Sequence, residues 1–155
     1  MTEIRIMREE DIEACVHAYR SAYAAEPWRE EYEKTEVLKY LEEFMAAGSA
    51  RCFVLTEDGE VRGLALMMLV PGIDAPYLRI EDFCIDAEYH RSGFGSRFME
   101  GIVGEAKRMG CDSLLLGTQN GFPSHRFYLK NGFREIESAL MYREVGGDEE
   151  RRPYV

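Results

Sequence analysis

The chain has 155 residues, of which 46% are hydrophobic and 31% are charged, values typical of one soluble globular domain with a sizeable core. Its 29 Asp and Glu residues outnumber its 19 Lys and Arg residues, and the net charge of −10 argues against a nucleic-acid partner and suits a cationic one. No apolar run approaches the roughly 18 residues that a membrane-spanning helix needs, and the charged N-terminal segment is unlike a signal peptide. We therefore expect a cytoplasmic protein with no membrane partner.

The four cysteines are far apart in the sequence, and no pair has C-x-x-C spacing. Only three histidines could act as further metal ligands. This pattern predicts neither a zinc site nor a disulfide framework. We expect no metal cofactor, and reduced, mostly buried thiols at Cys15, Cys52, Cys84 and Cys111.

The first half of the chain predicts two helices and four strands. Amphipathic spacing predicts helices over residues 12–23 and 37–45. Strands are expected at residues 4–7, 51–55, 60–70 and 77–86. Asp58-Gly59 is a hairpin signal between two of these strands. In the last strand, simple alternation places Glu81, Phe83 and Ile85 on one face.

The second half begins with the sequence HRSGFGSRF, residues 90–98. Further elements are expected after it: a helix at 96–109, a buried strand at 113–118, a short helix at 123–130 and a final strand pair at 133–137 and 139–145. Residues 1–145 should form one domain, and residues 146–155 a loose tail. The order βααβββαβαββ predicts an α/β protein with one large mixed sheet.

The two glycines of the loop, Gly93 and Gly95, allow a ligand to approach the backbone closely. The loop N–H groups and the N-terminus of the following helix should point toward one spot, which favours a phosphate group. Ser96 could add a hydroxyl and Arg91 a positive charge. A strand–Gly-x-Gly–helix turn can also serve tight packing alone, so the loop by itself does not decide between the two functions.

Two other phosphate sites fit the loop poorly. A Rossmann dinucleotide site needs a third small residue, where this chain has Phe98, and it needs a preceding βαβ unit. A P-loop needs a Gly-Lys-Ser/Thr sequence, which does not follow here.

The stretch IEDFCIDAEYHRSGFGSRFM resembles the pyrophosphate-binding motif of the GCN5-related N-acetyltransferase (GNAT) superfamily, whose members depend on acetyl-CoA. A second signature of that superfamily appears as FYLKNGF, residues 127–133, about thirty residues downstream. The predicted element order also agrees from about residue 4 to residue 145. His90 departs from the usual Gln or Arg, and its side chain has no assigned role.

This resemblance implies the GNAT fold, a mixed and mostly antiparallel splayed sheet flanked by helices. It also implies that acetyl-CoA is the co-substrate. Backbone amides of the loop would bind its pyrophosphate, and the pantetheine arm would pair with the backbone of the preceding strand. The residues implied in cofactor binding are Phe83, Cys84, Ile85, Arg91, Ser92, Gly93, Phe94, Gly95 and Ser96.

The resemblance also implies two catalytic residues. Tyr128 matches the family tyrosine near the coenzyme A sulfur, where it would act as general acid. Glu81 is the candidate general base, because IEDFCI looks like LEDFFV of the polyamine N-acetyltransferases. Asp82 is an ionisable competitor for this role. Cys84 fits a small core residue better than a covalent nucleophile, because the family transfers the acetyl group directly.

The acidic balance favours a small cationic acceptor, polyamine-like or aminoglycoside-like. Glu26, Glu30 and Glu31 could attract a cation next to Trp28, although a packed surface turn also explains that segment. The alternatives are a protein or peptide N-acetyltransferase and a non-catalytic acyl-CoA-binding regulatory module. A homodimer is compatible with the resemblance.

Overall fold

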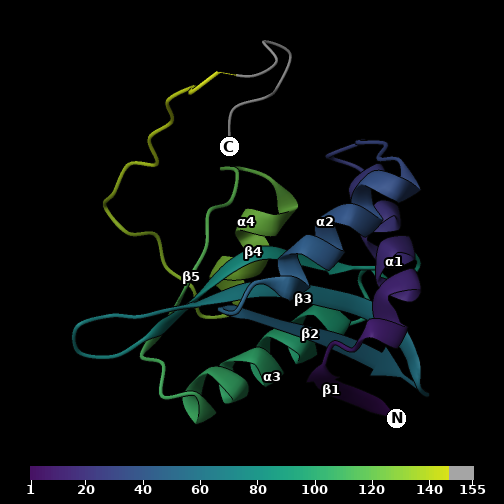
Figure 1. The fold of residues 1–155 in the computed structure, drawn as a ribbon, viewed down its shortest axis with the longest axis horizontal. Helices are drawn as coiled ribbons and strands as arrows, with labels where there is room; N and C mark the ends of the chain where they lie inside the picture. The colour runs from purple at the N-terminus through teal and green to yellow at the C-terminus, as the bar shows by residue number, and fades with distance from the viewer. Residues whose placement is uncertain (147–155) are drawn as a thin grey trace. The chain divides into compact units, whose positions relative to one another are not determined.

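The computed structural model describes residues 1–146, and the chain divides into two compact units, residues 1–116 and 117–155. In the first unit, five strands form one sheet in the order β1-β2-β3-β4-β5 (Figure 1). The strands are β1 (Thr2–Ile6), β2 (Ala50–Glu57), β3 (Glu60–Val70), β4 (Tyr77–Ile85) and β5 (Ser113–Leu115). The helices of this unit are α1 (Ile12–Ala24), α2 (Lys34–Ala46) and α3 (Phe94–Arg108), with 3-10 turns at Glu9–Asp11 and Ala87–Tyr89.

The sheet is mixed, because β1 to β4 pair antiparallel and β5 pairs parallel to β4. Helices flank it, so the predicted α/β architecture is confirmed. The turn between β2 and β3 is also as predicted: Asp58 has φ 51° and Gly59 has φ 84°. Two consecutive residues with positive φ are what a tight two-residue hairpin turn requires.

The two faces of the sheet are covered by different helices (Figure 1). Helices α1 and α2 pack on the face that carries Cys52, Val54, Leu64, Leu66 and Cys84, and together they form the main hydrophobic core. Alternation along the strands places Phe83 on the other face, where its ring lies 5.2 Å from that of Phe98 in α3.

Strand β4 contains an irregularity that simple alternation does not predict. Leu66 of β3 pairs with Asp82, but the next residue, Met67, pairs with Ile80, so Glu81 has no Cα partner in the register. An extra residue on one strand is a β-bulge, which interrupts the alternation of side chains. Alternation along β4 therefore does not by itself fix the face on which the Glu81 side chain lies, and its shared face with Phe83 and Ile85 stays a prediction.

Strand β5 is shorter and less buried than predicted. It ends at Leu115 rather than at residue 118, and Leu115 is 38% exposed. It pairs with β4 only at residues 77–79, because its three residues cannot reach further along β4.

The second unit contains α4 (Pro123–Lys130), which has the bounds that the sequence predicts. The predicted final strand pair at 133–137 and 139–145 is wrong for the described residues, which contain no strand after Leu115. A strand is stable only where a neighbour takes up its backbone hydrogen bonds. Four apolar side chains of this segment are instead 61–96% exposed: Ile136, Leu140, Met141 and Val145. The tail predicted from residue 146 lies, apart from that residue, outside the described part of the chain.

The cysteines are free thiols, as predicted, and all but Cys111 are buried. None of the helices described in residues 1–146 combines the length and apolar character that crossing a membrane requires. Within the same residues, no three His, Cys, Asp or Glu side chains lie close enough together to hold a metal ion.

Candidate active site

The last part of β4 presents an open backbone edge. Because β5 pairs only with residues 77–79, the rest of this edge has no strand beside it among the described residues. The amide of Asp86 donates to the carbonyl of Arg62 over 2.8 Å, which identifies these two residues as a hydrogen-bonded pair of the ladder. Gly63 and Ile85 are then a non-hydrogen-bonded pair, since the two kinds alternate in antiparallel strands. The N–H and C=O of Ile85 therefore point away from β3.

The same alternation separates the three β4 residues expected to meet the pantetheine arm. Phe83, like Ile85, directs its peptide groups to the open edge, whereas those of Cys84 point toward β3. The Cys84 side chain is 7% exposed in the core under α1 and α2. Burial raises the pKa of the Cys84 thiol well above its usual range, so the group is protonated at neutral pH. This agrees with a core residue and not with a nucleophile.

The loop after β4 has the backbone geometry of an anion site. Arg91 has φ 61° and Gly93 has φ 84°, so two residues of the loop lie in the left-handed region. Helix α3 begins directly after Gly93, and its first intrahelical acceptor is the Gly93 carbonyl, which Arg97 reaches at 3.2 Å. Phe94, Gly95 and Ser96 form the first turn, whose N–H groups have no acceptor within the helix. The helix begins two residues earlier than predicted, which places Gly95 and Ser96 inside this donor-rich turn.

Other loop residues secure this geometry. The Ser92 hydroxyl donates to the Tyr89 carbonyl, and the ring of Phe94 lies 5.9 Å from that of Tyr89. The guanidinium of Arg62 lies 4.1 Å from the centre of the Tyr89 ring on the same segment, a cation–π contact.

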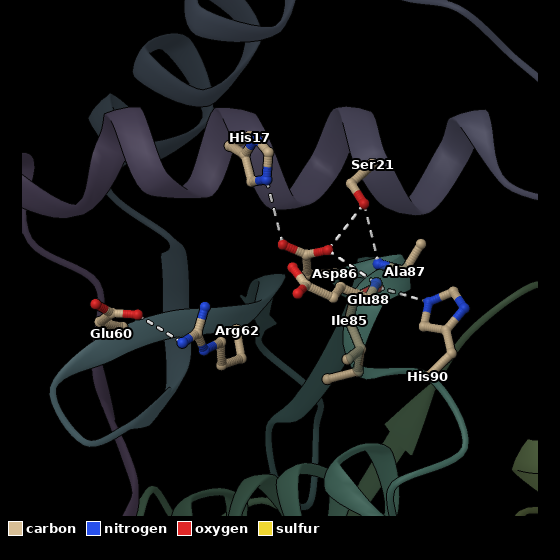
Figure 2. A network of polar contacts seen from close by, with 9 residues as sticks. All are labelled: His17, Ser21, Glu60, Arg62, Ile85, Asp86, Ala87, Glu88 and His90. Atoms are coloured by element: carbon tan, nitrogen blue, oxygen red, sulfur yellow. Dashed lines mark hydrogen bonds and ion pairs between the residues drawn. The ribbon is translucent and has the colours of Figure 1, made fainter.

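A polar network joins the loop to α1 (Figure 2). The carboxylate of Asp86, only 4% exposed, accepts hydrogen bonds from the Ser21 hydroxyl at 2.9 Å and from the Glu88 amide at 3.0 Å. The exposed His17 ring lies 3.4 Å from its other oxygen. On the opposite side of the loop, Nε2 of His90 lies 2.7 Å from the Ile85 carbonyl.

Glu81 lies at the bulge of β4, and its side chain is 17% exposed. Its carboxylate forms an ion pair with Arg79, a side chain that is 48% exposed. A pair with one solvated partner contributes little net free energy, so this contact can exchange for another.

Asp82 has a different environment. It is 8% exposed, one oxygen accepts from the Tyr23 hydroxyl at 2.7 Å, and the other accepts from the Tyr40 hydroxyl. Burial raises the pKa of Asp82, and the tyrosine hydrogen bonds oppose this effect only in part. Both oxygens are thus engaged by hydroxyl groups from α1 and α2.

An aromatic cluster surrounds this carboxylate. The Tyr23 ring packs at 4.6 Å from Tyr19 and at 5.8 Å from Trp28, measured between ring centres. Trp28 is therefore a packed side chain, and Glu26 beside it forms an ion pair with Arg29. These contacts support the packed-turn interpretation of residues 26–32.

In the second unit, Tyr128 is half-buried on α4 between two aromatic rings. Its ring centre lies 5.3 Å from those of both Phe127 and Phe133. Its backbone carbonyl accepts from the Phe133 amide at 3.0 Å, which closes the end of the helix. The signature FYLKNGF is thus a compact helix end with the tyrosine at its centre.

Sequence reasoning missed several residues that shape the site. Ser21, Tyr23 and Tyr40 carry no local signal, because their partners lie 42 to 66 residues away. Gly63 could have been found, because an isolated glycine inside a strand suggests a close approach of another backbone. A Cβ at Gly63 would lie 2.6 Å from Ile85 Cδ1 and 2.9 Å from the Cys84 carbonyl oxygen.

The sequence profile of the Acetyltransferase (GNAT) family matches residues 12–133. This match spans well over half of the chain, and the chain belongs to this family and is an N-acetyltransferase enzyme. The family uses acetyl-CoA as acetyl donor. A comparison with curated proteins found no match.

Solved structures share the fold. A possible acetyltransferase from Clostridium difficile 630 superposes with a TM-score of 0.82 at 16% identity, over 95% of this chain and 99% of that one. A GNAT family acetyltransferase from Staphylococcus aureus has a TM-score of 0.73 at 19% identity, over 92% and 98% of the two chains. The aminoglycoside N-acetyltransferase AAC(6')-Iy in complex with CoA has a TM-score of 0.74 at 18% identity, over 94% and 96%. At these identities the likeness shows the fold alone.

Proposed function

We propose that the protein transfers the acetyl group of acetyl-CoA to a primary amine of a small cationic molecule. The observation that carries this proposal is the open edge of β4 that leads into a loop with two left-handed residues at the N-terminus of α3. An open strand edge can pair with an extended amide-containing arm, and the loop can bind the phosphates that follow it.

In this proposal, backbone amides of residues 91–96 bind the pyrophosphate, and the first-turn amides of α3 are the main donors. The pantetheine arm pairs with the peptide groups of Phe83 and passes alongside Ile85, because both residues direct their peptide groups to the open edge. Cys84 contributes less than predicted, because its peptide groups face β3.

Glu81 is the proposed general base. An alkylammonium has a pKa near ~10.4, so its nitrogen must lose a proton before it attacks the thioester carbonyl at neutral pH. Glu81 would accept this proton through a water molecule. Asp82 suits the role less well, because both its oxygens already accept tyrosine hydroxyls.

Attack of the amine creates a negative charge on the thioester oxygen. The N–H of Ile85 at the open edge is the proposed donor to this oxyanion. The carbon–sulfur bond then breaks, and Tyr128 protonates the departing thiolate. The products are the N-acetylated amine and coenzyme A.

The net charge of −10 supports a cationic acceptor. The likeness in fold to the aminoglycoside N-acetyltransferase AAC(6')-Iy supports a small amine acceptor. We also propose that residues 1–145 act as one acetyltransferase domain, that the enzyme works in the cytoplasm, and that it forms a homodimer.

An acetylation assay on a panel of amines tests this function. Purified protein, acetyl-CoA and one amine at a time are incubated, and released thiol and N-acetylated product are measured together. We expect equal amounts of both with small cationic amines. If only peptides are acetylated, the acceptor is a protein or peptide and not a small amine. Coenzyme A binding without any turnover would indicate a non-catalytic module.

A further inference from the structure

The junction between β4 and α3 is held from two sides by side-chain contacts that the proposed chemistry does not use (Figure 2). On the α1 side, the Ser21 hydroxyl uses both of its hydrogen-bonding functions. It donates to the Asp86 carboxylate at 2.9 Å and accepts from the Ala87 amide at 3.0 Å. Asp86 in turn accepts from the Glu88 amide at 3.0 Å. One serine and one aspartate thus engage three consecutive residues after β4.

On the other side, the imidazole of His90 folds back to the end of β4. Its Nε2 lies 2.7 Å from the Ile85 carbonyl oxygen, so this nitrogen must carry a hydrogen and donate. The Ile85 carbonyl belongs to the open edge, where no strand of the described chain takes it up. The contact therefore closes the segment 85–90 into a short ring and satisfies a carbonyl that the sheet leaves open.

We infer that Ser21, Asp86 and His90, here called the loop clasp, are positioning residues that hold the coenzyme A loop in its binding conformation before the ligand arrives. The inference rests on the proposed coenzyme A site. None of the three side chains needs to touch the ligand for this role.

The physical reason is the cost of ordering. A loop that binds through backbone amides must hold several of them toward one point, and fixing the backbone of each residue costs conformational free energy. Arg91 adds to this cost, because a non-glycine residue with φ 61° occupies a sparsely populated region. The loop clasp fixes residues 86–90 and leaves a short segment, 91–93, between two anchored ends. A preorganised loop binds coenzyme A more tightly than a flexible one, because less conformational entropy is lost on binding.

The experiment combines calorimetry with coenzyme A and amide hydrogen exchange of the ligand-free protein. Ser21→Ala removes two contacts, and we expect its coenzyme A Kd to rise about tenfold; His90→Ala removes one solvent-accessible contact and should raise Kd about threefold. In both variants the amides of residues 86–93 should exchange faster, while those of the central strands β2 and β3 keep their wild-type rates.

Conservative variants separate positioning from general damage. Ser21→Thr keeps the hydroxyl, and His90→Gln keeps a side-chain donor, so both should restore most of the affinity. His17→Gln is the matched control, because this histidine also approaches Asp86, but at 3.4 Å and with a 75% exposed side chain. Its Kd should stay within about twofold of wild type.

The outcomes distinguish failure of the proposed function from failure of the loop clasp inference. If the wild-type protein does not bind coenzyme A, the proposed function fails. If it binds, and Ser21→Ala and His90→Ala bind equally well, the proposed function stands and the loop clasp inference is overturned. Faster exchange throughout the first unit would also overturn it, because the three residues would then stabilise the fold in general.

Discussion

The loop proposed to bind coenzyme A, residues 90–96, follows β4, and Asp82 lies in the second half of that strand, but the two regions are built in different ways. The loop is made of consecutive residues whose backbone N–H groups are the proposed ligands, with Gly93 and the start of α3 at its centre. The Asp82 region is assembled from side chains of β4, α1 and α2 that lie 42 and 59 residues apart in the sequence. Substitutions in the loop should therefore change cofactor affinity, and substitution of Asp82 should change mainly folding stability. The proposed catalytic residues Glu81 and Tyr128 should instead affect turnover.

The largest expected effect is at Gly93. Gly93→Val has space for its side chain, but valine strongly disfavours the φ of 84° that this position requires. The loop amides should lose their common direction, and the coenzyme A Kd should rise about 100-fold, which corresponds to one or two charge-assisted hydrogen bonds. Calorimetry on the folded variant measures this.

A matched control exists in the same helix. A side chain at Gly104 also meets open space, but this residue has no positive φ, so Gly104→Val should bind coenzyme A normally. Gly95→Val tests close approach in the first turn of α3 and should also raise the coenzyme A Kd, by no more than Gly93→Val does. Wild-type affinity in both Gly93→Val and Gly95→Val would place the pyrophosphate elsewhere.

The second effect concerns Tyr128 and should leave affinity intact. Tyr128→Phe removes a hydroxyl and little volume, so kcat should fall about 10²-fold, at the lower end of general acid contributions, with little change in the acetyl-CoA KM. Steady-state kinetics with the best amine measure both constants. Tyr142→Phe is a control, since Tyr142 is 51% exposed in the same unit. Normal turnover of Tyr128→Phe would show that this tyrosine only packs between its two phenylalanines.

The third effect should depend on pH. Glu81→Gln keeps the shape of the side chain and removes its basicity, so turnover should fall most at neutral pH. The deficit should shrink as pH rises toward the pKa of the amine, where the free base forms without help. Asp82→Asn is the comparison and should lose less activity. A wild-type pH–rate profile of Glu81→Gln, or a larger loss in Asp82→Asn, would assign the base to another residue.

The smallest effect is on folding stability at Asp82. Because burial raises the pKa of Asp82, the folded state holds this proton at pH values where the unfolded chain has released it. Its contribution to stability is complete below the ordinary carboxyl pKa and is lost as pH rises through the raised one. Asparagine does not titrate, so the stability of Asp82→Asn relative to wild type should improve between pH 4 and pH 7. Urea unfolding at several pH values tests this, and a constant difference would contradict it.

Asp11 provides a comparison for the Asp82 prediction. It is about as buried as Asp82, but its partner is the charged guanidinium of Arg5 and not a pair of neutral tyrosine hydroxyls. Arg5 forms a bidentate ion pair with Asp11, at 2.7 and 2.9 Å, and lowers the pKa of that carboxyl. Asp11 thus contributes stability above the ordinary carboxyl pKa and loses it as pH falls. Asp11→Asn should therefore be destabilised relative to wild type by a constant amount from neutral pH down to about pH 4, and its disadvantage should shrink only below pH 4, as pH falls through the lowered pKa.

The sequence predicted those structural features that depend only on residues close together in the chain. The Asp58-Gly59 turn, α4 with Pro123 at its start, and the two-glycine loop each depend on neighbouring residues, and the structure contains all three. The family followed from the loop together with FYLKNGF. Helix α3 begins two residues before the predicted start at residue 96, because Phe94 and Gly95 are compatible with either a loop or the first turn of a helix.

Non-local features could not be read in the same way. The bulge at Glu81 depends on how β4 aligns with β3, and alternation within β4 contains no information about that register. The prediction of a final strand pair is wrong because alternation of apolar residues produces a strand only where a neighbouring strand can pair with it. The tyrosine contacts of Asp82 required helices α1 and α2 to be placed first. His90 lacked a role in the sequence because its partner is a main-chain carbonyl.

A crystal structure of the protein with coenzyme A would test the proposed cofactor site directly. We expect the pyrophosphate within hydrogen-bond distance of backbone N–H groups of residues 91–96, and the pantetheine arm alongside the peptide groups of Phe83 and Ile85. A coenzyme A molecule bound away from the open edge of β4, or pyrophosphate held only by side chains, would contradict it.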